Sequence, residues 1–369
     1  MSSDALAPSN KIVLPRRRIN CVSFSPCGRY FAAGGDDFII RVFSTKDFSS
    51  PTSLVGHFGS VRQIQFSPTE PGLLASAGDD CSLRVWRGVT GGTPTSTASH
   101  SHAEAVSGLR FLPGGAEVAS AGLDGKLVIS PISGGKNPKI LRKESEGLSA
   151  LELWTPGELL AFGSVKGGLK GWSLGSQREV FRFEHTQKVS VLCLCAPPGT
   201  SLLLAAYADR SFRTFDLKTK TVAAETNLLT APLALVSPSE SQIFLAEGGK
   251  ISERSVPKLG EKRVVAEEKC EFSALAFAQK TRLLVSGDSE GQILVWDFSE
   301  GEKMLGATFE VPKIPGKEKA EAGLTYRVEK VDAAIAQLDK QLKLMDAMMN
   351  QNESQLSYIT SYFGKKGYL

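Results

Sequence analysis

Short apolar segments recur along most of the chain at a nearly constant interval. Their last residues lie 40 to 45 positions apart, and they are Phe24, Phe66, Phe111, Trp154, Leu194, Val236 and Phe277. A fixed period of about 20 to 50 residues is typical of repeat architectures, in which each unit buries its apolar face against its neighbours. The pattern therefore predicts seven structural units in series.

Each unit has the same internal order, which is clearest in the second one. An alternating segment at residues 61–66 precedes a run of small apolar residues at 73–78, and a third segment, 83–86, ends in Trp86. Alternation and short apolar runs of this length predict β-strands. The fourth segment varies most between units, as at residues 52–55, 139–141, 179–183 and 221–224. We therefore expect four strands in each unit.

Two positions recur in register within these units. The turn after the second strand carries an acid in five units, namely Asp37, Asp80, Asp124, Asp209 and Glu290. The third strand ends in an aromatic residue in five units, namely Phe43, Trp86, Trp172, Phe215 and Trp296. Asp accepts backbone hydrogen bonds in tight turns, and a large aromatic fills the space between neighbouring sheets. Lys166 in unit four, and Gly249 and Arg254 in unit six, depart from the pattern, which predicts looser packing of unit six.

The chain resembles the WD40 repeat family over about residues 11–310. Gly56 and His57 match the Gly-His element of the family, and Trp296 and Asp297 match its Trp-Asp element. The resemblance implies an all-β fold in which seven four-stranded sheets close into a β-propeller. It also implies that the second unit contains the family's buried hydrogen-bonding tetrad, whose members here are His57, Ser76, Asp80 and Trp86.

Closure of the ring requires an outer strand for the seventh sheet. Residues 11–14 precede the first full unit, and residues 303–309 follow the last third strand. Either segment, or both, can supply that strand and thereby cover an exposed sheet edge. Residues 1–10, which precede the first of these segments, are expected to be a flexible N-terminus.

A second pattern begins after the propeller. Residues 311–323 contain Pro312, Pro315 and Gly316 and predict a linker, and residues 324–363 predict one long helix, followed by a tail at 364–369. Apolar residues there follow a 4-3 spacing with Asn352 as the polar member, and this coiled-coil seam consists of Leu324, Val328, Val331, Ile335, Leu338, Leu342, Met345, Met349, Leu356, Ile359 and Phe363.

The predicted helix needs a partner for its seam. At about 1.5 Å per residue it is about 60 Å long, more than the thickness of one propeller. We expect a coiled coil with another chain, and folding back over the propeller is the alternative. Asp332, Asp339, Asp346 and Glu353 occupy one flank of the seam, which favours a partner helix with Lys or Arg over a homo-oligomer.

Composition and charge narrow the functional classes. Hydrophobic residues make up 41% of the chain and charged residues 22%, which is ordinary globular composition. The net charge of +4 is too small for binding dominated by phosphate neutralisation, so nucleic acid is an unlikely partner in this interpretation. No secretory signal or membrane-spanning segment is present, which predicts a cytoplasmic or nuclear protein without membrane insertion. The six cysteines are scattered and are expected to be buried thiols.

No motif for catalysis, a metal or a cofactor stands out. The chain has four histidines but no paired metal-ligand spacing, and its glycine pairs lack the residues of a phosphate-binding loop. One basic group is a candidate for binding an acidic peptide or RNA at one face, and it comprises Arg16, Arg17, Arg18, His102, His185 and Lys188. Lys136, Lys139, Arg142 and Lys143 form a second basic group, expected on an exposed loop and an outer strand.

These features together predict a non-enzymatic scaffold or adaptor subunit of a multiprotein assembly. It would associate through the coiled coil and present the propeller faces to protein partners. A ubiquitin-ligase receptor is less favoured, because Trp-Asp-x-Arg is absent after the third strands. The alternatives are an RNA-associated subunit in ribosome assembly or mRNA handling, and a centriolar or axonemal protein. A hydrolase of unknown type is the enzyme-class alternative.

Overall fold

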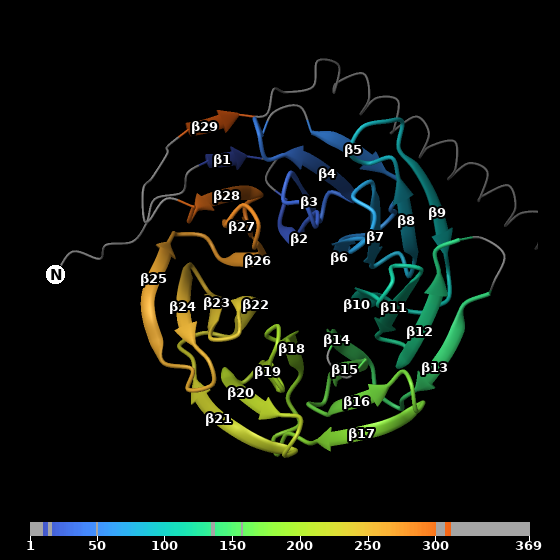
Figure 1. Ribbon diagram of the computed structural model, residues 1–369, viewed down its shortest axis with the longest axis vertical. Helices are drawn as coiled ribbons and strands as arrows, with labels where there is room; N and C mark the ends of the chain where they lie inside the picture. Colours follow the sequence, from blue (N-terminus) through green and yellow to red (C-terminus); the bar gives the residue numbers. More distant parts are fainter. Residues whose placement is uncertain are drawn as a thin grey trace, which may run out of the picture. The chain divides into compact units, whose positions relative to one another are not determined.

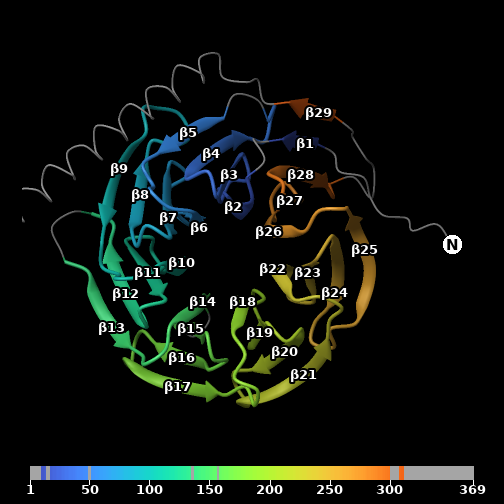
Figure 2. The same ribbon diagram turned by 180° about the vertical axis from the view of Figure 1, so that it is seen from behind.

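The strands form a ring of seven sheets. A computed structural model describes residues 10–13, 17–48, 51–133, 137–155, 158–299 and 307–310. Six sheets have four strands and one has five. In the four-stranded sheets the first strand lies innermost and the fourth lies at the rim, and in the five-stranded sheet β29 lies outermost (Figure 1). Figure 2 shows the other face of the ring. The predicted all-β, seven-bladed propeller is therefore confirmed.

The first four blades follow the chain in order. Blade one consists of β2 (Ile19–Phe24), β3 (Tyr30–Gly35), β4 (Ile39–Ser44) and β5 (Thr52–Val55). Blade two consists of β6 (Val61–Phe66), β7 (Leu73–Gly78), β8 (Leu83–Arg87) and β9 (Thr95–Ser99). Blade three consists of β10 (Val106–Phe111), β11 (Glu117–Gly122), β12 (Lys126–Pro131) and β13 (Lys139–Lys143). Blade four consists of β14 (Leu148–Trp154), β15 (Leu159–Ser164), β16 (Leu169–Ser173) and β17 (Arg178–Phe183).

The remaining blades include both terminal strands. Blade five consists of β18 (Val191–Cys195), β19 (Leu202–Tyr207), β20 (Ser211–Asp216) and β21 (Thr221–Asn227). Blade six consists of β22 (Pro232–Ser239), β23 (Gln242–Glu247), β24 (Lys250–Ser255) and β25 (Glu261–Glu267). Blade seven consists of β26 (Phe272–Ala278), β27 (Leu283–Asp288), β28 (Gln292–Asp297), β1 (Asn10–Val13) and β29 (Ala307–Glu310).

The second strands are buried on both faces because neighbouring blades cover them. β7, β15 and β27 bury all six of their residues. A side chain at Gly163 would place its Cβ 2.5 Å from the Cβ of Val191 in the next blade. Small residues in these strands therefore allow close contact between blades.

The third-strand aromatics lie between blades, as the repeat pattern predicts. Trp86, Phe215 and Trp296 belong to the cores shared by blades one and two, four and five, and six and seven. In blade three the position is Ser130, and Ile132 joins the core between blades two and three.

Blade six places a buried charge at the same position. Arg254 pairs in register with Ile243 and is 8% exposed. Its guanidinium lies 3.3 Å from the Glu247 carboxylate and donates to the Ser252 hydroxyl and the Leu259 carbonyl. An ion pair thus occupies the place that an aromatic ring fills in other blades.

Side-chain donors link neighbouring blades at the centre of the ring. The hydroxyls of Ser107, Ser149 and Ser273 donate to the backbone carbonyls of Leu148, Val191 and Ile19, each on the first strand of the next blade. The bond from Ser273 joins blade seven to blade one. Each bond gives a backbone carbonyl of the next blade a side-chain donor.

Both terminal segments complete blade seven. β1 pairs antiparallel with β28, and β29 pairs in parallel with β1 on its outer side. Of the possibilities left open above, the structure shows that both segments take part. Asn10 belongs to β1, so the sheet begins one residue earlier than the predicted boundary.

The chain divides into two units after Val311. The predicted linker, coiled-coil helix and tail, at residues 311–369, lie outside the described residues, as do residues 1–9. The coiled-coil seam from Leu324 to Phe363 therefore stays a prediction.

Candidate functional site

In blade two, four side chains form a hydrogen-bonded chain. The Trp86 indole N–H donates to the Ser76 hydroxyl at 2.8 Å, and the same hydroxyl lies 2.7 Å from His57 Nε2. His57 Nδ1 lies 2.8 Å from the Asp80 carboxylate. A neutral imidazole with its proton on Nδ1 satisfies all of these contacts. We call this group the blade-two tetrad.

The tetrad anchors the loop that enters blade two. The Asp80 carboxylate accepts hydrogen bonds from the Phe58 backbone N–H at 3.0 Å and the Ser82 hydroxyl at 2.8 Å. Burial alone would raise the pKa of Asp80, but these bonds and the His57 ring together lower it. Burial, together with the nearby charge of Arg84, lowers the pKa of His57 although Asp80 acts to raise it. The Phe58 side chain, whose backbone is held in this way, is 83% exposed.

Blade three repeats most of this arrangement. His102 Nδ1 lies 3.0 Å from Asp124, and its Nε2 lies 2.8 Å from the Ser120 hydroxyl. The Ala103 backbone N–H donates to Asp124 at 2.9 Å, as Phe58 does to Asp80 in blade two. His102 is 6% exposed, so it does not contribute to an exposed basic rim as the sequence predicted.

Blade five contains a partial version of the same contacts. His185 Nε2 lies 3.3 Å from both the Ser211 hydroxyl and the Asp209 carboxylate. The imidazole is 4.7 Å from the Tyr207 ring, and the residue is 4% exposed. Burial lowers the pKa of His185, which favours the neutral imidazole. His185 is therefore also wrongly placed in the predicted basic rim, because its ring is used inside the blade.

Of the predicted basic group at the face, the residues other than His102 and His185 are partly exposed where the structure describes them. Arg17 and Lys188 are exposed and Arg18 is half-buried, whereas Arg16 lies outside the described residues. Arg17 and Arg18 precede β2, and Lys188 lies in the loop between β17 and β18.

Exposed apolar side chains gather on the same side of the ring. Because the strands alternate in direction, loops joining the second and third strands and loops joining successive blades share one face, which we call the loop face. Five of the eight exposed large hydrophobic side chains of the described residues lie in these loops, and they are Phe38, Phe58, Leu123, Val165 and Leu229. The sequence interpretation missed this surface, although Phe58 directly follows the matched Gly-His element.

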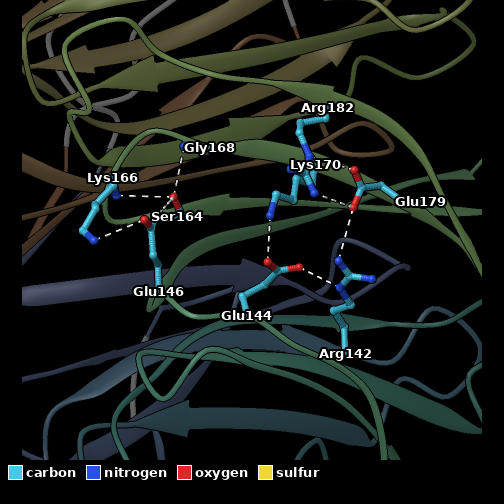
Figure 3. A network of polar contacts seen from close by, with 9 residues as sticks. All are labelled: Arg142, Glu144, Glu146, Ser164, Lys166, Gly168, Lys170, Glu179 and Arg182. Atoms are coloured by element: carbon cyan, nitrogen blue, oxygen red, sulfur yellow. Dashed lines mark hydrogen bonds and ion pairs between the residues drawn. The ribbon is translucent and has the colours of Figure 1, made fainter.

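Blade four has Glu144 where blade two has His57, and Lys166 where blade two has Asp80 (Figure 3). Glu144 accepts from Lys170 at 2.7 Å and from Arg142 at 2.8 Å, and Arg142 also lies 3.4 Å from Glu179 on the outer strand β17. These contacts join the outer strand of blade three to two strands of blade four. On the loop face, the Lys166 ammonium lies 3.2 Å from Glu146.

The aromatic of blade four lacks the partner that Trp86 has. Trp172 pairs in register with Leu160, and Phe162 stands where Ser76 stands in blade two. Accordingly, no acceptor for the buried Trp172 indole N–H is found among the described residues. Arg142 instead lies 5.6 Å over the face of the ring.

The described residues offer little for metal or thiol chemistry. Within them, no three His, Cys, Asp or Glu side chains are grouped closely enough to hold a metal ion. Cys21 and Cys195 are buried, as predicted for the cysteines, but the other four are half-buried. Burial raises the pKa of Cys193 to about 12. In the same residues, no helix has the length and apolar character needed to span a membrane.

Comparison with known proteins places repeats in the first three blades. The model of the family "WD domain, G-beta repeat" matches residues 13–44, 48–87 and 92–129. The second and third segments begin near the outer strand of one blade and continue through three strands of the next. WD40 repeats therefore make up the first three blades of the seven-bladed propeller.

The chain is also similar to several curated proteins over part of its length. It is 24% identical to nuclear distribution protein nudF of Aspergillus niger over 298 residues, which cover 79% of this chain and 61% of that protein. It is 31% identical to nuclear distribution protein nudF 1 of Talaromyces marneffei, covering 35% of this chain and 28% of that one. A striatin homolog of Dictyostelium discoideum is 26% identical, covering 52% and 26%. The chain thus spans less than two thirds of each of these relatives.

Proposed function

We propose that this protein is a non-enzymatic adaptor subunit that binds partner proteins through the loop face of its propeller. The observation that carries the proposal is Phe58, an aromatic side chain that is 83% exposed while the tetrad holds its backbone. An aromatic residue whose backbone is already fixed loses less freedom on binding, and Phe is among the residues enriched at protein interfaces. The similarity of this chain to nudF and to a striatin homolog also supports an adaptor role.

The predicted coiled coil at residues 324–363 supplies the second half of the proposal. It would pair with a partner helix that carries basic residues, and a homo-oligomer is the other assembly it permits. An adaptor of this kind would act in the cytoplasm or the nucleus and would need no cofactor.

Affinity purification separates the two contributions. The full chain is compared with Phe58→Ser, with Val222→Ser on outer strand β21 as the matched control, and with a chain ending at Val311. Phe58→Ser is expected to lose one set of co-purifying proteins and the shortened chain another, while Val222→Ser loses neither. Identical recovery by Phe58→Ser and the full chain would contradict binding at the loop face.

The coiled coil is tested by the double substitution Leu338→Asp and Leu342→Asp. Association through the tail should be lost and the thermal melting of the propeller unchanged, because the substituted residues lie in the predicted helix and not in the blades. Native mass measurement of the two proteins gives the stoichiometry. Unchanged association would reject the coil as its cause.

An RNA-associated role is the second candidate, favoured by the exposed Arg17 and Lys188 at the loop face. If this role holds, replacing both residues by Gln should make the slope of log RNA affinity against log salt concentration shallower, by the amount expected for the loss of about two phosphate contacts. An unchanged slope would dismiss it.

A further inference from the structure

We propose that the rim of blade three is a second binding site, which takes an extended acidic segment of a partner protein. The site consists of the outer strand β13 and a groove beside it, between blades three and four. It goes beyond the adaptor role proposed above, because it uses the edge of one blade and none of the loop-face residues.

The first observation is an open strand edge. β13 is the outermost strand of blade three, and no strand of the described residues pairs with its outer edge. Unpaired edges are templates for a further strand. The rim of this propeller already accepts one at blade seven, where β29 pairs with β1 from Asn10↔Ala307 to Val13↔Glu310. An extended segment along β13 would repeat that arrangement.

The second observation is a groove beside this edge, lined by both apolar and polar side chains. It has a volume of about 490 Å³. Its apolar lining comes from both blades and includes Ile129, Pro131, Leu141, Trp172 and Leu174, and its polar lining includes Lys139, Glu117 and Glu158. Four of the apolar side chains are only partly buried at the end of the core that blades three and four share. Volumes of about 300 to 1,000 Å³ are typical of binding pockets, so the groove has room for apolar side chains of a bound segment.

The wall of the groove is held in place before anything binds. Arg142 lies over the Trp172 ring and pairs with Glu144 and Glu179. These contacts fix the indole that lines the groove, which lowers the entropy lost on binding. They also engage Arg142, so recognition of charge falls to the two lysines of the strand.

The third observation is the charge of the strand. β13 has the sequence KILRK, and Lys139, Ile140 and Lys143 are exposed. The fourth strands of the other complete blades are either uncharged, as in β5 and β9, or contain glutamate, as in β17, β21 and β25. An outer strand with three basic residues and no acidic one therefore distinguishes blade three, because β17, with two arginines, also contains Glu179.

Charge and apolar lining together select the occupant. Two copies of β13 would bring like charges together, which opposes pairing of this chain with itself. A nucleic acid would neutralise the lysines but would leave the apolar part of the groove unfilled. Glu117 and Glu158 oppose an acidic side chain inside the groove, so a Leu, Ile, Met or Phe side chain would enter it. Acidic residues on either side of that apolar residue would meet the lysines of β13.

Peptide selection on the immobilised full chain tests this directly. Random peptides of about 12 residues are displayed on phage, and the enriched ones are synthesised and titrated by fluorescence anisotropy. We expect acidic residues around an apolar one. Peptide affinity should fall about tenfold or more in the double variant Lys139→Glu and Lys143→Glu. Both lysine side chains are exposed, so their replacement leaves the core unchanged. Leu141→Asp should have a similar effect through the groove.

Matched controls decide the outcome. Val222→Asp on β21 alters an exposed apolar residue of another outer strand and should leave peptide affinity unchanged. Phe58→Ser should also leave it unchanged, which separates this site from the loop face. The proposal is overturned if no acidic-apolar peptide is enriched, or if such peptides bind the charge-reversed variant equally well. It is also overturned if an oligouridylate displaces the peptides and depends on the same lysines, because the site would then bind nucleic acid.

Discussion

Blades two and four fill equivalent positions of one fold with different chemistry. In blade two the turn acid Asp80 is almost fully buried, with 7% of its side chain exposed, and its carboxylate ends the hydrogen-bonded chain that runs through the His57 ring. In blade four the same turn position is Lys166, whose side chain is 60% exposed and pairs with Glu146. The difference shows that a blade does not need the tetrad to form its four strands.

The two arrangements should nevertheless differ in energy. A buried acceptor that loses its partners costs more than an exposed ion pair, because water replaces the partner only at the surface. Blade two thus gains a fixed loop with an exposed aromatic, whereas blade four gains a connection between two outer strands. The following substitutions measure that contrast in order of decreasing effect.

Replacing Trp86 by Ala should lower the free energy of unfolding by about 3 to 5 kcal/mol, because a buried aromatic and a hydrogen bond are both lost. Denaturant titration of the purified chain measures it. Trp172→Ala in blade four is the matched control. Its loss should be smaller, because that side chain is half-buried and its indole N–H has no acceptor among the described residues. Equal losses would contradict the contrast between the two blades.

Replacing Glu247 by Ala tests the buried ion pair of blade six. The loss should be about 3 kcal/mol, because the Arg254 guanidinium loses a buried partner. The double variant Glu247→Leu and Arg254→Met should lie within about 1 kcal/mol of the original chain, since apolar groups of similar size often replace such pairs without loss. If the double variant is less stable than Glu247→Ala, the ion pair is itself stabilising and this interpretation of blade six is wrong.

Replacing Asp80 by Ala should lower the free energy of unfolding by about 2 kcal/mol, because His57, Ser82 and the Phe58 N–H all lose an acceptor. Hydrogen exchange of the Phe58 amide should become faster at the same time. Lys166→Ala in blade four should change stability by less than about 0.5 kcal/mol. If Asp80→Ala changes neither the free energy of unfolding nor the exchange rate of the Phe58 amide, the tetrad does not hold the loop.

Lowering the pH should weaken the propeller in two steps. The pKa values of His57 and His185 are lowered in the folded state, so the unfolded chain binds more protons as the pH falls through 6.5 and stability decreases. The pKa values of Asp80 and Asp209 are also lowered in the folded state, so the stability that they contribute above pH 3.8 is lost as the pH falls from there through their folded-state pKa values. Denaturant midpoints at a series of pH values check this. His57→Asn should reduce the first step, and an unchanged first step would remove His57 as its cause.

Much of the fold could be predicted from sequence, because the repeat period and the register of residues such as Asp80 and Trp86 are local signals. The number of repeats also predicted a closed ring. The order of β28, β1 and β29, however, depends on contacts between the chain ends. The sequence placed His102 and His185 in loops, which is right, yet the pairing that buries them involves residues 18 to 26 positions away. Burial of a loop side chain was not visible in a linear pattern.

The candidate sites were harder to predict for a related reason. Arg142, Trp172 and Glu179 come together across two blades, and single-residue signals do not report such pairing. The groove beside β13 is likewise a property of two neighbouring sheets.

Binding at the loop face is tested most directly by photo-crosslinking from the position of Phe58. A photoreactive phenylalanine analogue replaces Phe58 in one protein and Val222 in another, and the crosslinked polypeptides are identified from cells at equal expression. The account predicts that position 58 captures a defined partner that position 222 does not, and that Asp80→Ala in the same chain reduces the capture. Equal capture at the two positions, or no captured protein at position 58, would contradict it.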